Sequence, residues 1–426
     1  VQYIENLRFE KEQLDYLRST KDFDEDFLAY LENFRFSGDI YALEEGTVVF
    51  PGEPLMIVKA PIIEAQLMES ALLNIVNFQT LIATKASRVA YVAQPGQVSE
   101  FGLRRAQAPD AAVYGARAAL IGGCSSTSNV LAAQMCDTFA TGTHAHSWIM
   151  AFDSELEAFR AYAEIYPDSC LLLVDTYDTL RGVKNAITVF KEMREKGLKP
   201  KGIRLDSGDL AYLSKKAREM LDEAGFEDAM IFASGDLDEY TIQSLKLQGA
   251  RIDCYGVGTK LITSHSNPSL GGVYKICEVE ENGVMTPKMK ISDNPAKVTN
   301  PGEKRIFRLV SKNNNKAIAD VICLADEKID ESKPYTLIHP EYRWKTKEVR
   351  NFRAKELYRQ IYKDGKLVYD LPDLKTIQRR KRESFDEFWD EYKRLEKPHI
   401  YKVDLSEKLY NLKQKLIDEL VGKKGK

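Results

Sequence analysis

Short apolar runs alternate with helical segments over residues 170–258, and this rhythm constrains the fold more than any other feature of the sequence. The apolar runs are "CLLLVD", "KGIRLD", "AMIFASGD" and "IDCYGVG", and a helical pattern follows each of the first three. The three helical patterns end at Gly197, Gly225 and Gly249, and glycine is the residue best suited to a left-handed helix cap. Strands that alternate with helices of this length predict an α/β fold with a parallel sheet or barrel.

The rhythm begins near residue 100 and stops near residue 285, which divides the chain into three predicted regions. Residues 1–98 are expected to form helices and short strands, with two strands within "GTVVFPGEPLMIVKAP". Residues 99–285 are expected to form the α/β barrel region. Residues 286–426 look irregular and are expected to pack on the first region, with amphipathic helices in "RESFDEFWDEYKRLEKP" and "DLSEKLYNLKQKLIDEL". The tail "GKKGK" is expected to be solvated and disordered.

Composition excludes several classes of protein. With 44% hydrophobic and 29% charged residues, the chain is typical of soluble globular proteins, and its net charge of -3 gives no reason to expect nucleic acid as a partner. No apolar run approaches the roughly 20 residues of a membrane helix. The six cysteines are scattered without a C-x-x-C pair, which predicts reduced core thiols in a cytoplasmic protein.

Polar residues and glycines collect where each predicted strand ends. The carboxyl ends of the strands of an α/β barrel face one mouth, so we expect these residues to meet there. They are Asp175 and Thr176; Arg204, Asp206, Ser207 and Gly208; Ser234, Gly235 and Asp236; and Gly256, Gly258 and Thr259. Each glycine loop alone is compatible with a tight turn or a helix cap at Asp209 or Asp238. Three such loops at one mouth predict a ligand with two separated phosphate groups.

The stretch "RLDSGDL" offers the most chemistry. Backbone N–H groups at the start of the following helix suit a phosphate or pyrophosphate. Arg204 suits a planar carboxylate, because a guanidinium forms two parallel hydrogen bonds to it. Asp206 suits sugar hydroxyls or a Mg²⁺ ion that bridges phosphates.

Two further stretches contribute polar groups near the predicted mouth. "EFGLRRAQ" supplies Arg104 and Arg105 after a strand, where alternation directs only one of them inward. The alternative is a surface salt bridge for both. "GGCSSTSNV" supplies small hydroxyls, including Ser128, that either cap a helix or line the floor of a pocket.

"ATGTHAHSW" places His144 and His146 one residue apart in an apolar run that we expect to be a strand. Alternate residues of a strand share a face, so the pair can bind a metal, handle protons, carry a covalent group or fill a core. A metal-dependent hydrolase with a β/α barrel needs further histidines on later strands. Only His265, His339 and His399 remain, and only His265 falls in the barrel region, which disfavours that class.

The motifs together resemble those of bacterial nicotinate phosphoribosyltransferases. They are "EFGLRRAQ", "GTHAHSW", "VDTYDT", "GIRLDSGDL", "ASGDLDE" and "YGVGTKLITS…PSLGGVYK", and the resemblance extends through "EVRNFRAKEL" over essentially the whole chain. Nicotinamide phosphoribosyltransferase is a more distant relative of the same architecture.

The resemblance implies an irregular α/β barrel of the type II phosphoribosyltransferase kind, joined to an α+β domain built from both chain ends. It implies a homodimer with the active site near the subunit interface. The reaction implied is condensation of nicotinate with phosphoribosyl pyrophosphate to nicotinate mononucleotide and pyrophosphate, in NAD biosynthesis. The implied cofactors are Mg²⁺ and ATP, whose hydrolysis is coupled through a phosphorylated histidine.

The resemblance also implies roles for individual residues. His146 falls on the phosphorylated histidine, whereas His144 falls on a position that is commonly not histidine. Arg204 falls on the group that meets the pyridine carboxylate, and Asp206 and Asp175 fall on ribose and Mg²⁺ contacts. The remaining substrate contacts carried over are Arg104, Gly142, Thr143 and Ser128. The phosphate contacts are Ser207, Gly208, Ser234, Gly235, Gly256, Gly258 and Thr259.

Two alternatives to this function follow from the same comparison. A nicotinamide-using enzyme is the first, but Ser128 stands where an amide-selecting carboxylate would be expected, which favours nicotinate. The family's T-D-x-Y segment, whose tyrosine stacks on nicotinate in the neighbouring subunit, is not among these 426 residues. A chain without that tyrosine is expected to lose substrate stacking, which makes a catalytically weak nucleotide-binding homologue the second alternative.

Overall fold

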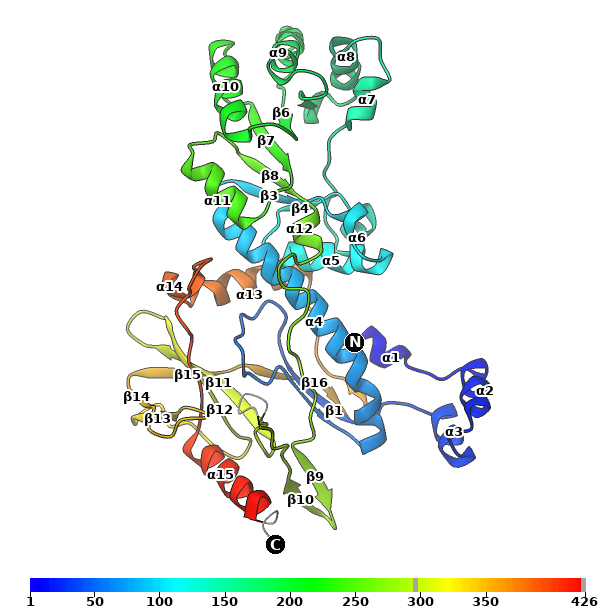
Figure 1. Ribbon diagram of the computed structural model, residues 1–426, viewed down its shortest axis with the longest axis vertical. Coiled ribbons are helices and arrows are strands. Elements are labelled where there is room, and N and C mark those ends of the chain that lie inside the picture. The colour runs from blue at the N-terminus through cyan, green and yellow to red at the C-terminus, as the bar shows by residue number, and fades with distance from the viewer. Residues whose placement is uncertain (294–297, 423–426) are drawn as a thin grey trace. The chain divides into compact units, whose positions relative to one another are not determined.

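The computed structural model describes residues 1–293 and 298–422 (Figure 1). The chain divides into two compact units. We call residues 1–75, 271–372 and 379–426 the terminal unit, and residues 76–270 and 373–378 the central unit. Within the described ranges, every helix is too short or too polar to cross a membrane. The last four residues of the predicted disordered tail lie outside these ranges.

A six-stranded parallel sheet forms the middle of the central unit and confirms the predicted α/β fold. Its strand order is β4-β3-β8-β7-β6-β5. The strands are β3 (Gln97–Glu100), β4 (Ser126–Thr127), β5 (Leu171–Leu173), β6 (Gly202–Leu205), β7 (Met230–Gly235) and β8 (Cys254–Val257). Their burial on both faces explains the continuous apolar runs in the sequence.

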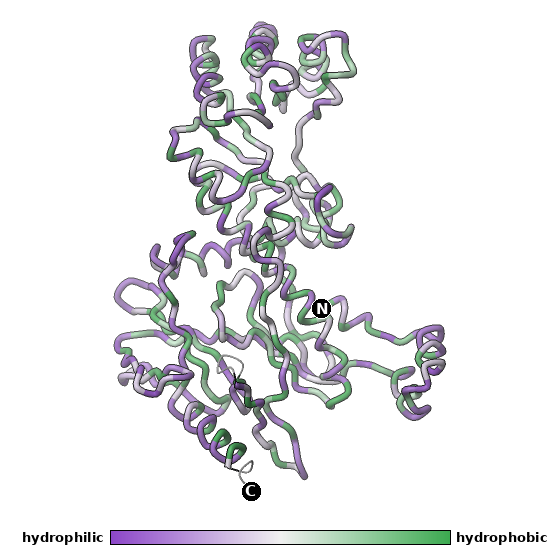
Figure 2. The backbone as a smooth tube through the Cα atoms, viewed as in Figure 1, coloured by the Kyte–Doolittle hydropathy of each residue, from purple (hydrophilic) through white to green (hydrophobic). Residues whose placement is uncertain are grey.

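Helices cover this sheet, and their ends follow the predicted signals. Asp178, Asp209 and Asp238 cap the N-termini of α9, α10 and α11 with side-chain hydrogen bonds. After these helices the three predicted glycines have φ of +74°, +75° or +76°. The helices are α5 (Pro109–Gly122), α6 (Val130–Met135), α7 (His146–Met150), α8 (Glu155–Ile165), α9 (Thr179–Glu195), α10 (Leu210–Glu223), α11 (Glu239–Leu247) and α12 (Thr259–Ile262), with 3-10 turns η1 (Leu103–Arg105) and η2 (Pro167–Ser169). Figure 2 shows many hydrophilic residues along α8, α9 and α10.

The sheet of the central unit is open rather than closed into a regular barrel. Its pairing begins at β4 and ends at β5, and in the described residues no ladder joins these two edge strands. A single parallel bridge joins Ala140 to Thr127 of β4. The parallel sheet is therefore confirmed, whereas a closed barrel is not.

The predicted strand in "ATGTHAHSW" is wrong. Only Ala140 pairs with a strand, and the helix α7 begins at His146. The reason is tertiary packing: the helical turn buries Ile149 and directs the Trp148 indole N–H to the Ala158 carbonyl at 3.1 Å. The two histidines consequently do not share a face, because His144 is buried and His146 is partly exposed.

The terminal unit joins the two ends of the chain in a four-stranded sheet of order β17-β16-β1-β2. Here β1 (Asp39–Leu43) lies between β2 (Met56–Lys59) and β16 (Tyr358–Lys363), and β17 (Lys366–Leu367) forms the edge. Only β2 falls in the stretch where two strands were predicted, because residues 44–55 form turns and irregular backbone. The helices before this sheet are α1 (Gln2–Asn6), α2 (Lys11–Thr20) and α3 (Glu25–Glu32), and α4 (Ile62–Ala93) continues from this unit into the central one.

A second sheet gives the terminal unit the α+β character that the resemblance implied, although the sequence pattern of residues 286–426 looked irregular. It has six strands in the order β14-β13-β18-β12-β11-β15 and is antiparallel except between β12 and β18. The strands are β11 (Lys304–Ser311), β12 (Ala317–Leu324), β13 (Tyr335–Ile338), β14 (Thr346–Val349), β15 (Phe352–Glu356) and β18 (Val403–Leu405). The hairpin β9 (Glu278–Glu281) and β10 (Val284–Pro287) precedes them, and α13 (Leu374–Asp386), α14 (Asp390–Lys393) and α15 (Glu407–Gly422) are the helices of this part. The second predicted helix is confirmed by α15, whereas the first is broken between α13 and α14.

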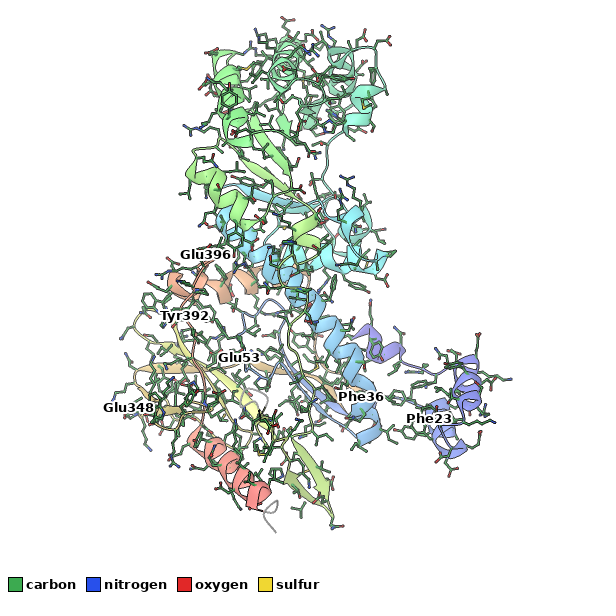
Figure 3. The ribbon with its side chains drawn as sticks, viewed as in Figure 1. Phe23, Phe36, Glu53, Glu348, Tyr392 and Glu396 are labelled. Atoms are coloured by element: carbon green, nitrogen blue, oxygen red, sulfur yellow. The ribbon has the colours of Figure 1, made fainter. Side chains whose placement is uncertain are left out.

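A buried ion network explains why the strand β11 was missed. Arg308 is fully buried and forms hydrogen bonds of 2.8 and 3.0 Å with Asp320, which also accepts a hydrogen bond from the Tyr401 hydroxyl at 2.8 Å. A charged residue at an inward position hides the apolar alternation that identifies a strand. Glu53, labelled in Figure 3, lies in the same cluster, where burial and the nearby Asp320 raise its pKa well above the usual range.

Replacing Arg308 with leucine is expected to lower the free energy of unfolding by about 3–5 kcal/mol, because the Asp320 charge remains buried without its partner. Denaturant titration followed by tryptophan fluorescence measures this, since Trp344 and Trp389 report on the terminal unit. The matched control is Arg350→Leu, which breaks an exposed pair with Glu348 (Figure 3) and is expected to cost less than about 1 kcal/mol. Equal losses in the two variants would contradict the structural role of the buried network.

Candidate active site

The predicted polar residues do meet at the carboxyl edge of the parallel sheet. Asp175 follows β5, Asp206 follows β6, and Ser234 and Gly235 end β7. These strands are neighbours and run in the same direction, so their last residues lie at one edge. The loops that leave them carry the side chains of the candidate site.

Asp175 links the first two of these loops. Its Oδ2 atom accepts hydrogen bonds from the Asp206 backbone N–H at 2.9 Å and from the Ser207 hydroxyl at 2.7 Å. Its side chain is only 1% exposed. Its Oδ1 atom is buried and, among the described residues, has no hydrogen-bond partner. A buried carboxylate oxygen without a partner is a ready ligand for a cation.

His146 lies next to the carboxylates of Asp175 and Asp206, which we call the carboxylate pair. Its Nδ1 atom lies 3.1 Å from the Thr176 hydroxyl, and its Nε2 atom lies 4.0 Å from Asp175 Oδ1 and 3.8 Å from Asp206 Oδ2. The ring is 41% exposed, so a ligand can reach it. The structure therefore brings together His146, Asp175 and Asp206, the residues that the sequence predicted to be catalytic.

The Arg204 guanidinium lies beside Asp206 and donates hydrogen bonds from all three of its nitrogens. We call this arrangement the Arg204 fork. Its Nε, Nη1 and Nη2 atoms donate to the Ser234 hydroxyl at 2.8 Å, the Thr143 hydroxyl at 2.7 Å and Asp206 Oδ1 at 2.8 Å. A guanidinium carries five N–H groups, so each terminal nitrogen keeps one N–H for a ligand. Its Cζ atom lies 5.4 Å from the centre of the Phe101 ring. This arrangement suits a flat anionic ligand beside an aromatic face.

Asp206 stays ionised in this setting. Burial alone would raise its pKa, but the hydrogen bond from Ser234 and the charge and hydrogen bond of Arg204 outweigh burial and lower the pKa below its usual value. The site thus keeps a carboxylate available at acidic and neutral pH.

At two of the glycines predicted to bind phosphate, close packing leaves no room for a side chain. Gly235 has φ of +115°, and a Cβ atom there would lie 2.8 Å from the Asp206 carbonyl oxygen. Gly256 packs against Phe101 and Phe232, where a Cβ atom would lie 2.9 and 2.7 Å from their rings. A side chain at either position would therefore separate neighbouring strand ends.

An ion pair joins the loop after β7, which contains Asp238, to the first turn after β8, which contains Lys260. Lys260 Nζ lies 2.8 Å from Asp238 Oδ2, while Asp238 Oδ1 caps α11 through the Thr241 N–H at 2.8 Å. Burial opposes ionisation of Asp238, but these contacts outweigh it and lower the pKa to about 2. Gly258 and Thr259 lie in this same turn, next to Lys260.

The other predicted residues lie around this centre. Gly208 has φ of +83° and lies in the loop before α10. Arg104 is exposed on η1, directly after β3. Ser128 follows β4 and donates its backbone N–H to the Glu100 carbonyl at 3.0 Å. Gly142 is exposed in the irregular segment that leads to His146.

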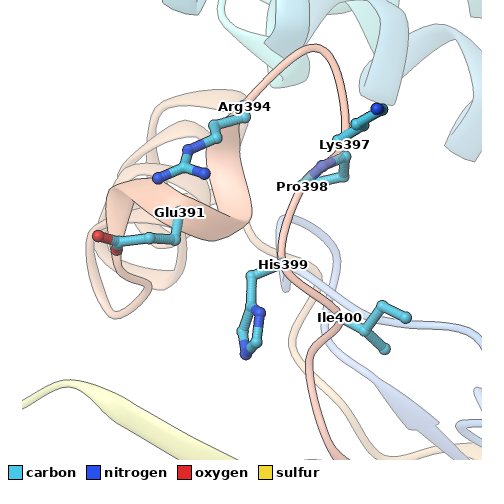
Figure 4. Close-up of a pocket in the computed structure, with 6 residues that line it drawn as sticks. All are labelled: Glu391, Arg394, Lys397, Pro398, His399 and Ile400. Carbon is cyan, nitrogen blue, oxygen red and sulfur yellow. The ribbon is translucent and has the colours of Figure 1, made fainter.

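A dedicated protein-only metal site is not part of this arrangement. Within residues 1–293 and 298–422, no three His, Cys, Asp or Glu side chains are grouped as metal ligands. A surface pocket of about 380 Å³ lies in the terminal unit, lined by Glu391, Arg394, Lys397, Pro398, His399 and Ile400 (Figure 4). It contains none of the predicted site residues.

Known proteins share both the sequence and the fold. Family models for the nicotinate phosphoribosyltransferase N-terminal domain, family and C-terminal domain match residues 1–77, 96–332 and 303–413. The chain belongs to the nicotinate phosphoribosyltransferase family. Its relatives in this enzyme family include nicotinate phosphoribosyltransferase of Bacillus subtilis, 50% identical over 99% of this chain and 86% of the relative. Another is that of Caenorhabditis elegans, 34% identical over 96% of this chain and 83% of the relative.

Solved structures agree with membership of the nicotinate phosphoribosyltransferase family. Human nicotinic acid phosphoribosyltransferase matches with a TM-score of 0.86 and 29% identity, over 97% of this chain and 90% of that one. Nicotinate-nucleotide pyrophosphorylase from Pyrococcus furiosus matches with a TM-score of 0.67 and 26% identity, over 85% and 84% of the two chains. The similarity therefore includes both units of this member of the family.

Sequence reasoning missed several residues at this site. Thr176 was noticed at a strand end, but no role was given to its hydroxyl. Phe101 and Glu100 stand inside "EFGLRRAQ", of which only the arginines were predicted to contribute to the site. Glu100 is fully buried and accepts a hydrogen bond from the Thr127 hydroxyl at 2.6 Å and another from the Gly102 N–H. A carboxylate as the last residue of the short strand β3 was the available signal.

Replacing Lys260 with methionine is expected to raise the pKa of Asp238 from about 2 toward its ordinary value of 3.8. The folded-state pKa lies below the unfolded one, so the pair stabilises the wild type above about pH 4, and this stability is lost as pH falls toward 2. The variant should lose less stability over that range. Carboxyl ¹³C NMR titration measures the pKa, and Lys199→Met, which breaks an exposed pair with Asp228, should leave Asp238 unchanged. An unaltered Asp238 titration in Lys260→Met would contradict the assignment.

Proposed function

We propose that the chain condenses nicotinate with phosphoribosyl pyrophosphate, giving nicotinate mononucleotide and pyrophosphate in NAD biosynthesis. The observation that carries the proposal is the Arg204 fork beside the Asp175–Asp206 carboxylate pair. The fork suits the carboxylate of nicotinate, and the pair suits a sugar on which positive charge develops. Membership of the nicotinate phosphoribosyltransferase family supports the same reaction.

In the proposed reaction the pyridine nitrogen attacks C1 of the ribose and pyrophosphate leaves. Breaking the C1–oxygen bond places positive charge on the sugar, which nearby carboxylates stabilise. Pyrophosphate is a good leaving group, so the protein mainly positions the two substrates. Arg104 on η1 and Thr143 beside Arg204 are the proposed further contacts of the base, together with Ser128 and Gly142.

Mg²⁺ fits the acidic side of the site. The partnerless Oδ1 atom of Asp175 and the ionised Asp206 are oxygen ligands of the kind that Mg²⁺ takes along with substrate phosphates. The ion, when bound, neutralises charge on the pyrophosphate group. The two aspartates would hold it, and Ser207 keeps Asp175 oriented by its 2.7 Å hydrogen bond.

The glycine loops suit the phosphate groups of phosphoribosyl pyrophosphate. Ser207 and Gly208 precede α10, a helix of 14 residues whose N-terminal backbone N–H groups favour an anion. The strand ends at β7 and β8 lie side by side, because Ser234 pairs with Gly256 and Gly235 with Val257. We assign the 5′-phosphate to these ends, Gly235 and the loop Gly256, Gly258 and Thr259, on the strength of the family motif.

His146 is the proposed carrier of a phosphoryl group from ATP. Its Nδ1 atom is engaged by Thr176, which leaves Nε2 free to take the γ-phosphoryl group of ATP while ADP leaves. Hydrolysis of the resulting N–P bond then returns the free imidazole. A phosphoryl group adds about two negative charges next to the carboxylate pair, so its arrival changes how strongly the site binds Mg²⁺ and the substrate phosphates.

A homodimer is the proposed assembly, supported by an exposed apolar patch on α6 and the segment after it. The patch consists of Val130, Leu131, Met135 and Phe139, with exposed fractions of 71%, 54%, 53% and 88%. Exposed patches of large apolar side chains are typical of interaction surfaces. The patch directly precedes in the sequence the segment that carries Thr143 and His146, which favours an interface near the site. The free cysteines support a reducing, cytoplasmic compartment.

Replacing His146 with alanine is expected to abolish stimulation by ATP while leaving part of the ATP-independent synthesis, because the phosphoryl acceptor is lost and the substrate contacts remain. Nicotinate mononucleotide is measured with and without ATP. His399→Ala, in the terminal unit, is the matched control and should keep full stimulation. Full ATP coupling in the His146 variant would remove this residue from the mechanism.

Replacing Arg204 with alanine is expected to raise the KM for nicotinate about a hundredfold, because two charge-assisted hydrogen bonds of about 1.5 kcal/mol each are lost. Arg204→Lys keeps the charge but not the fork and should recover only part of the affinity. Parallel assays with nicotinamide test base selection, since the amide has no charge for Arg204 to meet. A nicotinate KM equal to that of the wild type, or a wild-type preference for nicotinamide, would contradict the assignment.

A further inference from the structure

The imidazole of His144 occupies the open edge of the parallel sheet. Among the residues that the structure describes, β5 is an edge strand paired only with β6, and the Val174 N–H donates to the Arg204 carbonyl on that side at 3.1 Å. The Leu173 N–H consequently points to the free edge. There it donates to His144 Nε2 at 3.1 Å, so a side chain accepts the hydrogen bond that a further strand would otherwise accept.

The same segment is attached to the opposite edge strand. The Thr141 N–H donates to the Thr127 carbonyl on β4 at 2.9 Å. Residues 140–145 thus span the gap between β4 and β5, with one backbone contact at the first strand and one imidazole contact at the second. The His144 ring is held in place edge-on to Tyr162, with ring centres 4.6 Å apart.

His144 also connects directly to the candidate active site. Its carbonyl accepts a hydrogen bond from the Thr143 hydroxyl at 3.0 Å, and that hydroxyl accepts one from Arg204 at 2.7 Å. On its other side, His146 meets Thr176, three residues beyond Leu173 on the same chain segment. The contact between His144 and Leu173 therefore joins the segment that carries His146 to the segment that carries Thr176 and Asp175.

We infer that His144 is a positioning residue, which fastens the segment 140–145 to β5 and thereby aligns His146 and Thr143 with the carboxylate pair. The role requires a neutral ring with its proton on Nδ1, since Nε2 accepts from the Leu173 N–H. Burial keeps the ring neutral, because it lowers the pKa of His144 to about 4. A residue that only filled space would need the ring but not its acceptor nitrogen.

The first test needs no mutation and no activity. In ¹⁵N NMR of the full chain near pH 7, His144 should be neutral with Nε2 unprotonated, and the Leu173 amide should be protected from hydrogen exchange. A protonated Nε2, or rapid exchange at Leu173, would overturn the inference. This result does not depend on the proposed function.

The second test rests on the proposed function and compares variants. His144→Phe keeps an aromatic ring against Tyr162 but has no acceptor, and is expected to slow phosphoryl transfer from ATP to His146 roughly 10²-fold. His144→Gln retains an acceptor oxygen and should recover most of the rate. Phe159→Leu loosens the same core, since its ring lies 6.2 Å from His144, but leaves the acceptor in place and should change the rate little.

The outcomes distinguish the positioning role of His144 from ATP coupling through His146. If the wild type forms phosphohistidine and His144→Phe forms it at the same rate, the positioning role is wrong. If the wild type forms none, ATP coupling is wrong, and the positioning role is then judged by the ¹³C shifts of His146. These shifts should change in His144→Phe and return toward wild type in His144→Gln, and identical shifts in all three chains would overturn the inference. Should His144→Phe fail to fold, the wild-type NMR test and the glutamine variant decide.

Discussion

The candidate site depends on one carboxylate that serves two loops. Asp175 is almost completely buried and accepts hydrogen bonds from the backbone of Asp206 and the hydroxyl of Ser207. These bonds keep the loop after β6 folded against the loop after β5. Because Arg204 in turn bonds to Asp206, the guanidinium and both carboxylates are oriented through the same residue.

The charges of Arg204 and Asp206 are paired only in part. Arg204 lowers the pKa of Asp206 and gives up one N–H to it, while the Thr143 and Ser234 hydroxyls hold the guanidinium away from a full bidentate pair with that carboxylate. With three of its five N–H groups used in this way, the guanidinium keeps one N–H on Nη1 and one on Nη2 for a substrate.

The sequence predicted the regular part of the central unit because local signals and tertiary packing agree there. Glycine caps, aspartate N-caps and apolar runs each act within a few residues, so the strands β5 to β8 and their helices follow from them. The strand-end residues Asp175, Arg204, Asp206 and Ser234 were found because parallel strands bring their ends to one edge.

Prediction failed where distant contacts decide the conformation. The stretch "ATGTHAHSW" alternates like a strand, but burial of Ile149 and the contact of Trp148 with Ala158 turn it into a helix from His146 onward. The strand β11 was hidden because Arg308 occupies a core position through Asp320, a residue on the next strand. Neither partner can be identified from the local sequence.

The division of the chain also has a consequence for the order of folding during synthesis. Nearly all of the central unit is one continuous stretch, residues 76–270, whereas the terminal unit needs residues from both ends of the chain. The strand β1 pairs with β16, more than three hundred positions later in the sequence. A chain leaving the ribosome can therefore complete the parallel sheet and its carboxyl edge first. The residues before 76 must wait, with one edge of β1 unpaired, until β16 in the C-terminal part is made.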